Sequence, residues 1–373
     1  MSILYEPFRI GGLELPNRFV RSATAERMAD ADGRPRAKLR ALYRDLAEGG
    51  VGLIITGHLY VHPSGKAHPE MTGIHRDDLI PDLRALCDAV HNAGGRIAAQ
   101  LNHGGMQCSR ETAKETLAPS AIDASFLDRR PRALTSDAID ELIDAYAAAA
   151  RRAQEAGFDA VQIHGAHGYL VNQFLSPFTN RRKDHWGSLP AEGDTDLGPA
   201  EANPTFLSAV CGAIRRQVGP DYPLFIKLGM MDGVEGGLKP EDGGRIVAKL
   251  EGMGLDAVEI SGGISGGEPL NTRGAIRTPT DEAYFRPLAE LAHQKTSLPI
   301  MLVGGLRSRI VMEDVLESGD ADLVSMCRPL ICEPDLPGRF RREEGERARC
   351  TSCNQCWPEE RGEGIACVLS SAD

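Results

Sequence analysis

The clearest fold signal in this chain is Gln154-Glu-Ala-Gly-Phe-Asp-Ala-Val-Gln-Ile163, where a helical segment ends at a glycine and an apolar strand follows. Glycine is a favoured helix terminator, and a mostly apolar strand is typical of a parallel sheet that helices cover on both faces. The pattern recurs elsewhere in the chain, which indicates a fold built from strand–helix units. The other copies are Ala47-Glu-Gly-Gly-Val-Gly-Leu-Ile-Ile55, Gly252-Met-Gly-Leu-Asp-Ala-Val-Glu-Ile260 and Glu317-Ser-Gly-Asp-Ala-Asp-Leu-Val324.

The number and spacing of the strands favour a closed (β/α)8 TIM barrel, an α/β fold, over an open doubly wound sheet. Phe8-Arg-Ile-Gly-Gly-Leu-Glu-Leu-Pro16 alternates around a Gly-Gly turn and predicts an N-terminal β-hairpin that caps the barrel floor. We therefore expect a barrel domain over residues 1–340 and a cysteine-rich extension over residues 341–373. Strands are expected near 17–24, 51–57, 95–101, 158–164, 222–228, 255–261, 298–303 and 321–325.

The composition is that of an ordinary globular enzyme, with 373 residues of which 42% are hydrophobic and 25% charged. A formal net charge of −11 makes nucleic acid a poor partner. No apolar run approaches the roughly 20 residues of a membrane span. The N-terminus also lacks the basic segment and apolar core of a secretory signal. We expect a cytoplasmic enzyme that acts on a small molecule, without a nucleic-acid or membrane partner.

In a barrel, the side chains that follow the carboxyl ends of the strands line the active site. His164, His167 and Tyr169 come at the end of one predicted strand. Two imidazoles can hydrogen-bond one electron-rich oxygen while a phenol supplies a proton. These three residues are therefore the candidate catalytic residues. The structural alternatives are that the histidines bond barrel backbone or bind a metal, and that the phenol only packs at the mouth.

The other strand ends indicate a pocket for a phosphorylated, heteroaromatic cofactor. Arg328 and a glycine pair follow the last two strands, where barrels commonly hold phosphate. Lys227 closes an apolar strand and needs an anionic or polar partner, so a pair with Asp232 or Glu259 is the structural alternative. Gln100 offers a donor and an acceptor, which fits the edge of a flavin pyrimidine. The candidate cofactor-binding residues are Ser22, Ala23, Thr24, Gln100, Lys227, Gly304, Gly305, Cys327 and Arg328.

The cysteines are concentrated at the carboxyl end of the chain, where four of the nine form a C-x2-C-x2-C-x10-C motif. Core packing rarely produces this spacing, so the motif predicts a metal or cluster site. Thiolate quartets suit either tetrahedral zinc or an iron–sulfur cluster, and the spacing leaves both open. The candidate ligands are Cys350, Cys353, Cys356 and Cys367.

Motifs spread over residues 3–340 carry a family resemblance. They read Pro16-Asn-Arg-Phe-Val-Arg-Ser22, Ala99-Gln-Leu-Asn-His-Gly-Gly105, His164-Gly-Ala-His-Gly-Tyr-Leu-Val-Asn-Gln-Phe-Leu-Ser-Pro177, Asn180-Arg-Arg-Lys-Asp184 and Val303-Gly-Gly-Leu306. Together they resemble the old yellow enzyme family of FMN-dependent ene-reductases. The cysteine tail, with Cys353-Asn-Gln-Cys356, resembles the branch that contains 2,4-dienoyl-CoA reductase and trimethylamine dehydrogenase, in which four such cysteines hold a [4Fe–4S] cluster.

This resemblance implies FMN as the cofactor and NADH or NADPH as the electron donor. Gln100 would contact the FMN pyrimidine, and Lys227 would lie near its N1–C2=O end. Gly305 and Arg328 would hold the phosphate. No Rossmann Gly-x-Gly-x-x-Gly motif is present, so the nucleotide would dock in the same barrel mouth.

The resemblance also implies catalytic roles. His164 and His167 would bind the carbonyl oxygen of an electron-poor alkene, such as an enone. Tyr169 would protonate the α-carbon after hydride from the flavin N5 reaches the β-carbon. The sequence departs from the family at Ala25, where many relatives place Cys or Thr beneath the flavin, and only Thr24 could substitute there. The acidic, Gly/Pro-rich segment 190–204 predicts a loop of altered shape.

Other functions stay open at the level of sequence. An amine dehydrogenase or demethylase on the same scaffold would pass electrons through the cysteines to a separate carrier protein. The tail could instead be a zinc ribbon that binds another protein, with the barrel as a scaffold. Helices outside the barrel are also compatible with a homo-oligomer. A metal-dependent barrel hydrolase would use His58, His103, His164 and His167.

Overall fold

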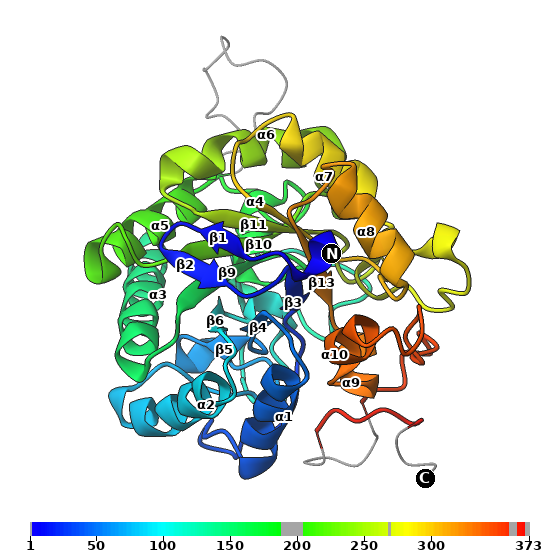
Figure 1. Cartoon of the computed structure of the whole chain (residues 1–373). Helices are drawn as coiled ribbons and strands as arrows, with labels where there is room; N and C mark the ends of the chain where they lie inside the picture. The colour runs from blue at the N-terminus through cyan, green and yellow to red at the C-terminus, as the bar shows by residue number, and fades with distance from the viewer. Residues whose placement is uncertain (1, 188–203, 268–269, 358–363, 370–373) are drawn as a thin grey trace.

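The computed structural model describes residues 2–187, 204–267, 270–357 and 364–369. Within these residues, one sheet of nine strands forms the centre of the molecule (Figure 1). Its strands pair in parallel in the order β4-β3-β13-β12-β11-β10-β9-β6, and an additional β4–β6 pairing closes the ring. Strand β5 (Leu59–Tyr60) pairs with β6. The ring strands are β3 (Phe19–Arg21), β4 (Leu53–Ile55), β6 (Ile97–Asn102), β9 (Ala160–Gly165), β10 (Leu224–Gly229), β11 (Ala257–Ser261), β12 (Ile300–Leu302) and β13 (Leu323–Met326).

Helices surround this ring on its outer side (Figure 1). They alternate with the strands along the chain, so the expected (β/α)8 TIM barrel is confirmed. The longer helices are α1 (Ala37–Glu48), α2 (Ile80–Asn92), α3 (Ser136–Ala156), α5 (Thr205–Val218), α6 (Pro240–Leu250), α7 (Arg286–His293) and α8 (Arg309–Glu317), and the shorter ones are α4 (Leu170–Leu175), α9 (Arg328–Cys332) and α10 (Leu336–Arg341).

Helix α3 shows how the repeated motif forms. At its start, the Thr135 side chain accepts a hydrogen bond from the backbone N–H of Ala138, which satisfies one of the free donors of the first turn. At its end, Gly157 adopts a left-handed conformation with φ 94° and donates its N–H to carbonyls of the last turn. Strand β9 follows and is buried along its whole length. The glycine therefore turns the chain from the outer helix into the barrel wall.

The amino-terminal hairpin closes one end of the barrel. Strands β1 (Phe8–Ile10) and β2 (Leu13–Leu15) pair antiparallel, and the hairpin crosses the end of the barrel that faces the viewer in Figure 1. Ile10 and Leu15 belong to a buried cluster with barrel residues such as Val20 and Phe225. The expected capping hairpin is thus confirmed, and the carboxyl ends of the strands open at the other end.

The cysteine-rich tail packs on the open end of the barrel. The backbone N–H of Ile365 donates to the carbonyl of Glu26 at 2.9 Å, and that of Ala275 donates to the carbonyl of Ser352 at 3.1 Å. The predicted loop 190–204 lies almost entirely outside the described residues, which resume at Pro204. None of the described helices combines the length and apolarity needed to cross a membrane.

Candidate active site

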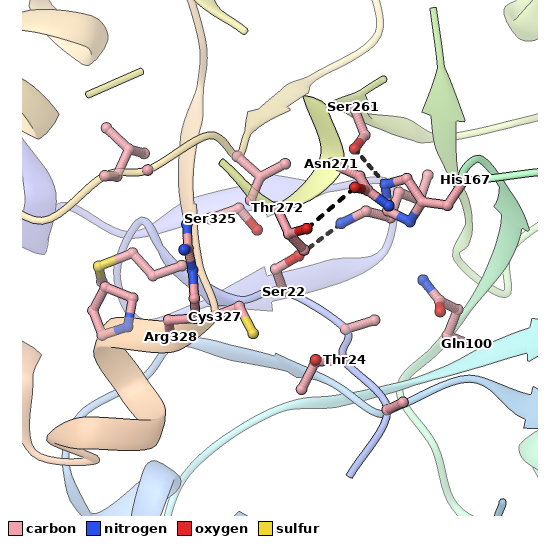
Figure 2. A pocket seen from close by; sticks show the side chains of 18 of the residues that line it. Ser22, Thr24, Gln100, His167, Ser261, Asn271, Thr272, Ser325, Cys327 and Arg328 are labelled. Atoms are coloured by element: carbon pink, nitrogen blue, oxygen red, sulfur yellow. Dashed lines mark hydrogen bonds between the residues drawn. The ribbon is translucent and has the colours of Figure 1, made fainter. Parts of the chain in front are cut away.

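A pocket opens at the carboxyl ends of the barrel strands (Figure 2). All but one of the residues predicted to bind a cofactor line it, and so do the three predicted catalytic residues. Gly304 is the exception, although its neighbours Val303 and Gly305 both line the pocket. The predicted residues that line it are Ser22, Ala23, Thr24, Gln100, His164, His167, Tyr169, Lys227, Gly305, Cys327 and Arg328.

The two predicted histidines and the tyrosine gather on one wall of the pocket. The His164 ring lies 5.2 Å from that of His167 and 4.8 Å from that of Tyr169, between centroids. His167 has φ 61°, a left-handed conformation that non-glycine residues rarely adopt and that is often found at functional sites. Its Nε2 lies 2.8 Å from the Ser261 hydroxyl (Figure 2). The His164 Nδ1 is buried without a hydrogen-bond partner within the described residues, as expected for an atom that binds a ligand.

The protonation states of these residues follow from their burial. Burial lowers the pKa of His167 to about 3 and that of His164 well below its usual value. Burial also raises the pKa of Tyr169 to about 12. At neutral pH the imidazoles are therefore uncharged, each with one N–H donor, and the phenol keeps its proton. The wall can donate hydrogen bonds to an oxygen and can also deliver a proton.

Lys227, at the end of β10, supplies a positive charge to the pocket. Its Nζ lies 3.1 Å from Glu259 Oε1 and donates a hydrogen bond to Ser22 Oγ at 2.7 Å. The pair with Glu259, foreseen as the structural alternative, is therefore present. No ion pair joins Lys227 to Asp232 within the described residues, and Asp232 instead accepts a hydrogen bond from Ser176 Oγ at 2.6 Å. Lys227 nevertheless still lines the pocket, so the ion pair and a cofactor contact are compatible.

The region after β12 and β13 has the features of a phosphate site. Gly305 has φ 74°, and a Cβ atom there would lie 3.0 Å from Tyr284 Cε1, so glycine is favoured at this position, which lines the pocket. Arg328 is buried rather than paired at the surface, and it donates to the carbonyl of Arg273 at 2.8 Å and to Asn354 Oδ1. A guanidinium beside a glycine turn suits a phosphate group. Together with Gln100 and Lys227, these residues fit FMN.

The cysteine tail forms part of the same pocket, which the sequence did not reveal. Ser352 and Trp357 line it, and the Trp357 indole N–H donates to the carbonyl of Ala25 at 3.0 Å. His58, Asn271 and Tyr284 are further lining residues outside the predicted cofactor and catalytic sets. Only His58 had a signal in the sequence, since it follows a barrel strand. The others come from loops and from the tail, whose positions no local pattern predicts.

The four cysteines of the motif are close in sequence but do not form a ready metal site. Cys350, Cys356 and Cys367 are buried, whereas Cys353 is exposed. Cys367 packs against Cys350 and against Cys332, which is not part of the motif. No three His, Cys, Asp or Glu side chains in the described ranges are arranged to hold one metal ion. The thiols as placed therefore do not fit a cluster or zinc.

The histidines of the hydrolase alternative are also not gathered around one point. His103 does not line the pocket; its Nε2 lies 2.9 Å from Ser64 Oγ and its Nδ1 accepts the N–H of Gly105 at 3.0 Å. The rings of His58 and His164 are 6.2 Å apart between centroids. The geometry therefore gives no support to a metal centre built from these four histidines.

Known proteins place the chain in a family. The model of the NADH:flavin oxidoreductase / NADH oxidase family matches residues 3–346. A NADH oxidase of Thermoanaerobacter brockii is 34% identical over 94% of this chain and 52% of its own length, so the chain spans about half of that relative. A NADPH dehydrogenase of Geobacillus sp. (strain WCH70) is 34% identical over 92% of this chain and 95% of its own length.

Solved structures agree with this assignment. The old yellow enzyme homologue from Zymomonas mobilis superposes with a TM-score of 0.77 at 27% identity, covering 96% of this chain and 98% of that one. The resemblance that the sequence motifs carried is thereby confirmed over nearly the whole barrel. The chain belongs to the NADH:flavin oxidoreductase / NADH oxidase family, within which its fold is that of the old yellow enzymes.

Proposed function

We propose that this protein is an FMN-dependent NAD(P)H oxidoreductase that reduces the C=C bond of α,β-unsaturated carbonyl compounds. The observation that carries the proposal is the wall of uncharged donors, His164, His167 and Tyr169, in a pocket that also has the features of a phosphate site. Membership of an NADH:flavin oxidoreductase family supports the cofactor and the electron donor.

FMN would be held by residues from several strand ends. Gln100 and Lys227 would contact its pyrimidine, and Gly305 with Arg328 would bind its phosphate. Bound there, FMN supplies hydride transfer from the nicotinamide to the substrate, chemistry that no amino-acid side chain provides. The protein contributes orientation and charge, and it admits the nicotinamide and the alkene to the same pocket in turn.

His164 and His167 would act on the substrate oxygen. Hydride addition to a conjugated alkene builds negative charge on the remote carbonyl oxygen. Two neutral N–H donors that meet this oxygen stabilise the transition state more than the ground state. Both imidazoles are uncharged at neutral pH, and each keeps one N–H with which it can donate to this oxygen. Tyr169 would then donate its phenolic proton to the α-carbon.

Anaerobic half-reactions test this proposal directly. The purified protein, reconstituted with FMN, is mixed with NADPH or NADH and then with 2-cyclohexenone, while the flavin absorbance is followed. We expect bleaching by the nicotinamide and recovery of the absorbance on addition of the enone. Failure to bind FMN would reject the cofactor assignment. Bleaching of the oxidised flavin by a panel of amines in place of the nicotinamide, or recovery of the absorbance with no alkene at all, would reject the substrate class.

We further propose that the chain divides into two parts: the FMN barrel, residues 1–340, and a tail, residues 341–373, that binds a metal ion or cluster. The C-x2-C-x2-C-x10-C spacing supports binding of a [4Fe–4S] cluster or zinc, although the thiols would have to rearrange around it. Elemental analysis of anaerobically purified protein distinguishes the two: iron with acid-labile sulfide indicates a cluster, and zinc without sulfide indicates a structural ion. Stoichiometric absence of both would reject the proposal.

A further inference from the structure

A buried carboxylate lies beneath the pocket, inside the barrel. The Glu259 side chain, on β11, is 0% exposed. It lies 3.1 Å from Lys227 Nζ, and it accepts hydrogen bonds from Ser325 Oγ at 2.7 Å and from Gln162 Nε2 at 3.0 Å. Every one of these partners offers a hydrogen to the carboxylate. From the sequence, Glu259 is expected to be no more than a possible structural partner of the lysine.

Glu259 is charged in spite of its burial. Burial acts to raise its pKa, but Lys227 and the hydrogen bonds from Ser22, Ser325 and Lys227 outweigh it and hold the pKa below its usual value. A buried ion is tolerated only when its charge and its lone pairs are satisfied, as they are here. Glu259 and Lys227 therefore form an ion pair whose net charge is close to zero.

The carboxylate also controls the orientation of Gln100. Gln162 donates its amide N–H to Glu259, which turns the Gln162 Oε1 toward Gln100. This oxygen accepts a hydrogen bond from Gln100 Nε2 at 2.7 Å. The backbone N–H of Gln100 donates to Thr56 Oγ1 at 3.1 Å, which fixes the strand at this point. With Nε2 engaged, the Oε1 of Gln100 remains as an acceptor for a ligand. An acceptor at this position matches the N3–H of a flavin pyrimidine.

We propose that Glu259 is a positioning residue that sets the electrostatic environment of the flavin from inside the barrel. It compensates the charge of Lys227, and through Gln162 it presents the acceptor oxygen of Gln100 to the pyrimidine. The inference rests on the proposed FMN site. Negative charge on reduced FMN collects at the N1–C2=O end, where Lys227 is expected to lie, so a compensated lysine stabilises the reduced form less than a lone lysine does.

The midpoint potential of the bound flavin tests this inference. Glu259→Gln keeps the shape and removes the charge. We expect it to raise the affinity for reduced FMN relative to oxidised FMN about tenfold, which corresponds to a positive shift of about 30 mV for a two-electron couple. Lys227→Gln should shift the potential in the opposite direction. The double variant should return close to the wild type, since both charges are then absent.

Glu333→Gln is the matched control. Glu333 is also 0% exposed and ion-paired, to Arg339 at 3.0 Å and to Arg349 at 3.1 Å, but neither arginine lines the pocket, whereas Lys227, the partner of Glu259, does. Its substitution should destabilise the fold without moving the potential. If Glu259→Gln does not fold or bind FMN, the comparison of Lys227→Gln with the double variant replaces it, and the double variant should have the more positive potential.

The outcomes separate this inference from the proposed function. A potential that responds to Lys227→Gln but not to loss of Glu259, in the single or the double variant, overturns the role of Glu259 and leaves the FMN site intact. If neither substitution moves the potential, Lys227 does not face the flavin and the proposed cofactor geometry is wrong as well. Wild-type turnover of 2-cyclohexenone has no bearing on either result, because the readout is an equilibrium potential.

Discussion

The barrel mouth and the cysteine tail hold their polar groups in different ways. In the mouth, His164, Lys227 and Glu259 project from strands whose backbones are hydrogen-bonded to both neighbours, so their spacing is set by the sheet. In the tail, the thiols lie outside regular secondary structure, and one of them, Cys353, is exposed. The polar side chains of the barrel mouth are held in place by the protein alone. Thiol ligands, in contrast, commonly become ordered only around their metal. We therefore expect reactions in the barrel mouth to continue when residues of the tail are changed.

The largest expected effect concerns the proton donor of the mouth. Tyr169→Phe keeps the ring and removes the proton, so we expect reoxidation of the flavin by 2-cyclohexenone to slow by about 10²–10⁴. Reduction by NADPH should be nearly unchanged, because that step needs no acid. Stopped-flow absorbance measures both half-reactions. Equal slowing of the two half-reactions would indicate that Tyr169 has a structural role and is not the proton donor of the pocket.

Acid should destabilise the mouth rather than the tail. Burial lowers the pKa of His58 to about 3, so the unfolded chain binds a proton between about pH 6.5 and 3 while the folded chain does not. The free energy of unfolding is therefore highest above pH 6.5 and falls as the pH drops. For this histidine the loss is about 2 kcal/mol at pH 5. Residues 341–373 contain no histidine.

Thermal unfolding between pH 7 and 4.5 measures this effect. His58→Phe should show a shallower loss of unfolding temperature than the wild type, and Cys353→Ser should keep the wild-type slope. An identical slope in His58→Phe and the wild type would show that His58 is solvated enough to be protonated in the folded protein.

Trp357 belongs to the tail but lines the pocket, so its substitution tests whether the tail contributes to FMN binding. Trp357→Ala removes one wall of the pocket and the hydrogen bond to the carbonyl of Ala25. We expect FMN to bind about tenfold more weakly, the effect of one lost hydrogen bond with its packing. Trp186→Ala, outside the pocket, is the control. FMN affinity is measured by fluorescence titration. An unchanged affinity would mean that the tail lies over the pocket without contributing to FMN binding.

The smallest expected effect concerns the exposed thiol. Cys353→Ser should change the rate of NADPH-driven reduction of 2-cyclohexenone by less than about twofold, because the substitution lies outside the pocket and surface changes of this kind are mild. It should also abolish any stoichiometric iron or zinc. A fall in the enone rate in proportion to the metal lost would show that the tail takes part in the reaction.

The sequence predicted most of the barrel and of its mouth, for reasons that are local. Several strand ends are marked by a polar residue that closes an apolar run, as Lys227 does, and the barrel fold brings such ends together. Glu259 shows where this reasoning stops. It occurs within an apolar strand, and its partners Lys227, Gln162 and Ser325 come from other strands. Their meeting depends on the register of the closed sheet.

The helices ending in glycine, the buried strands and the polar strand ends could be predicted from the amino-acid sequence, because all of them follow from periodicity and turn chemistry within a few residues. Which distant groups meet depends on how the chain packs in three dimensions. This packing pairs Lys227 with Glu259, lays Trp357 of the tail against Ala25, and keeps His103 out of the pocket. The physical reason is that a residue's local conformation depends on its neighbours in sequence, whereas its partners depend on how the closed ring of strands and the loops above it pack.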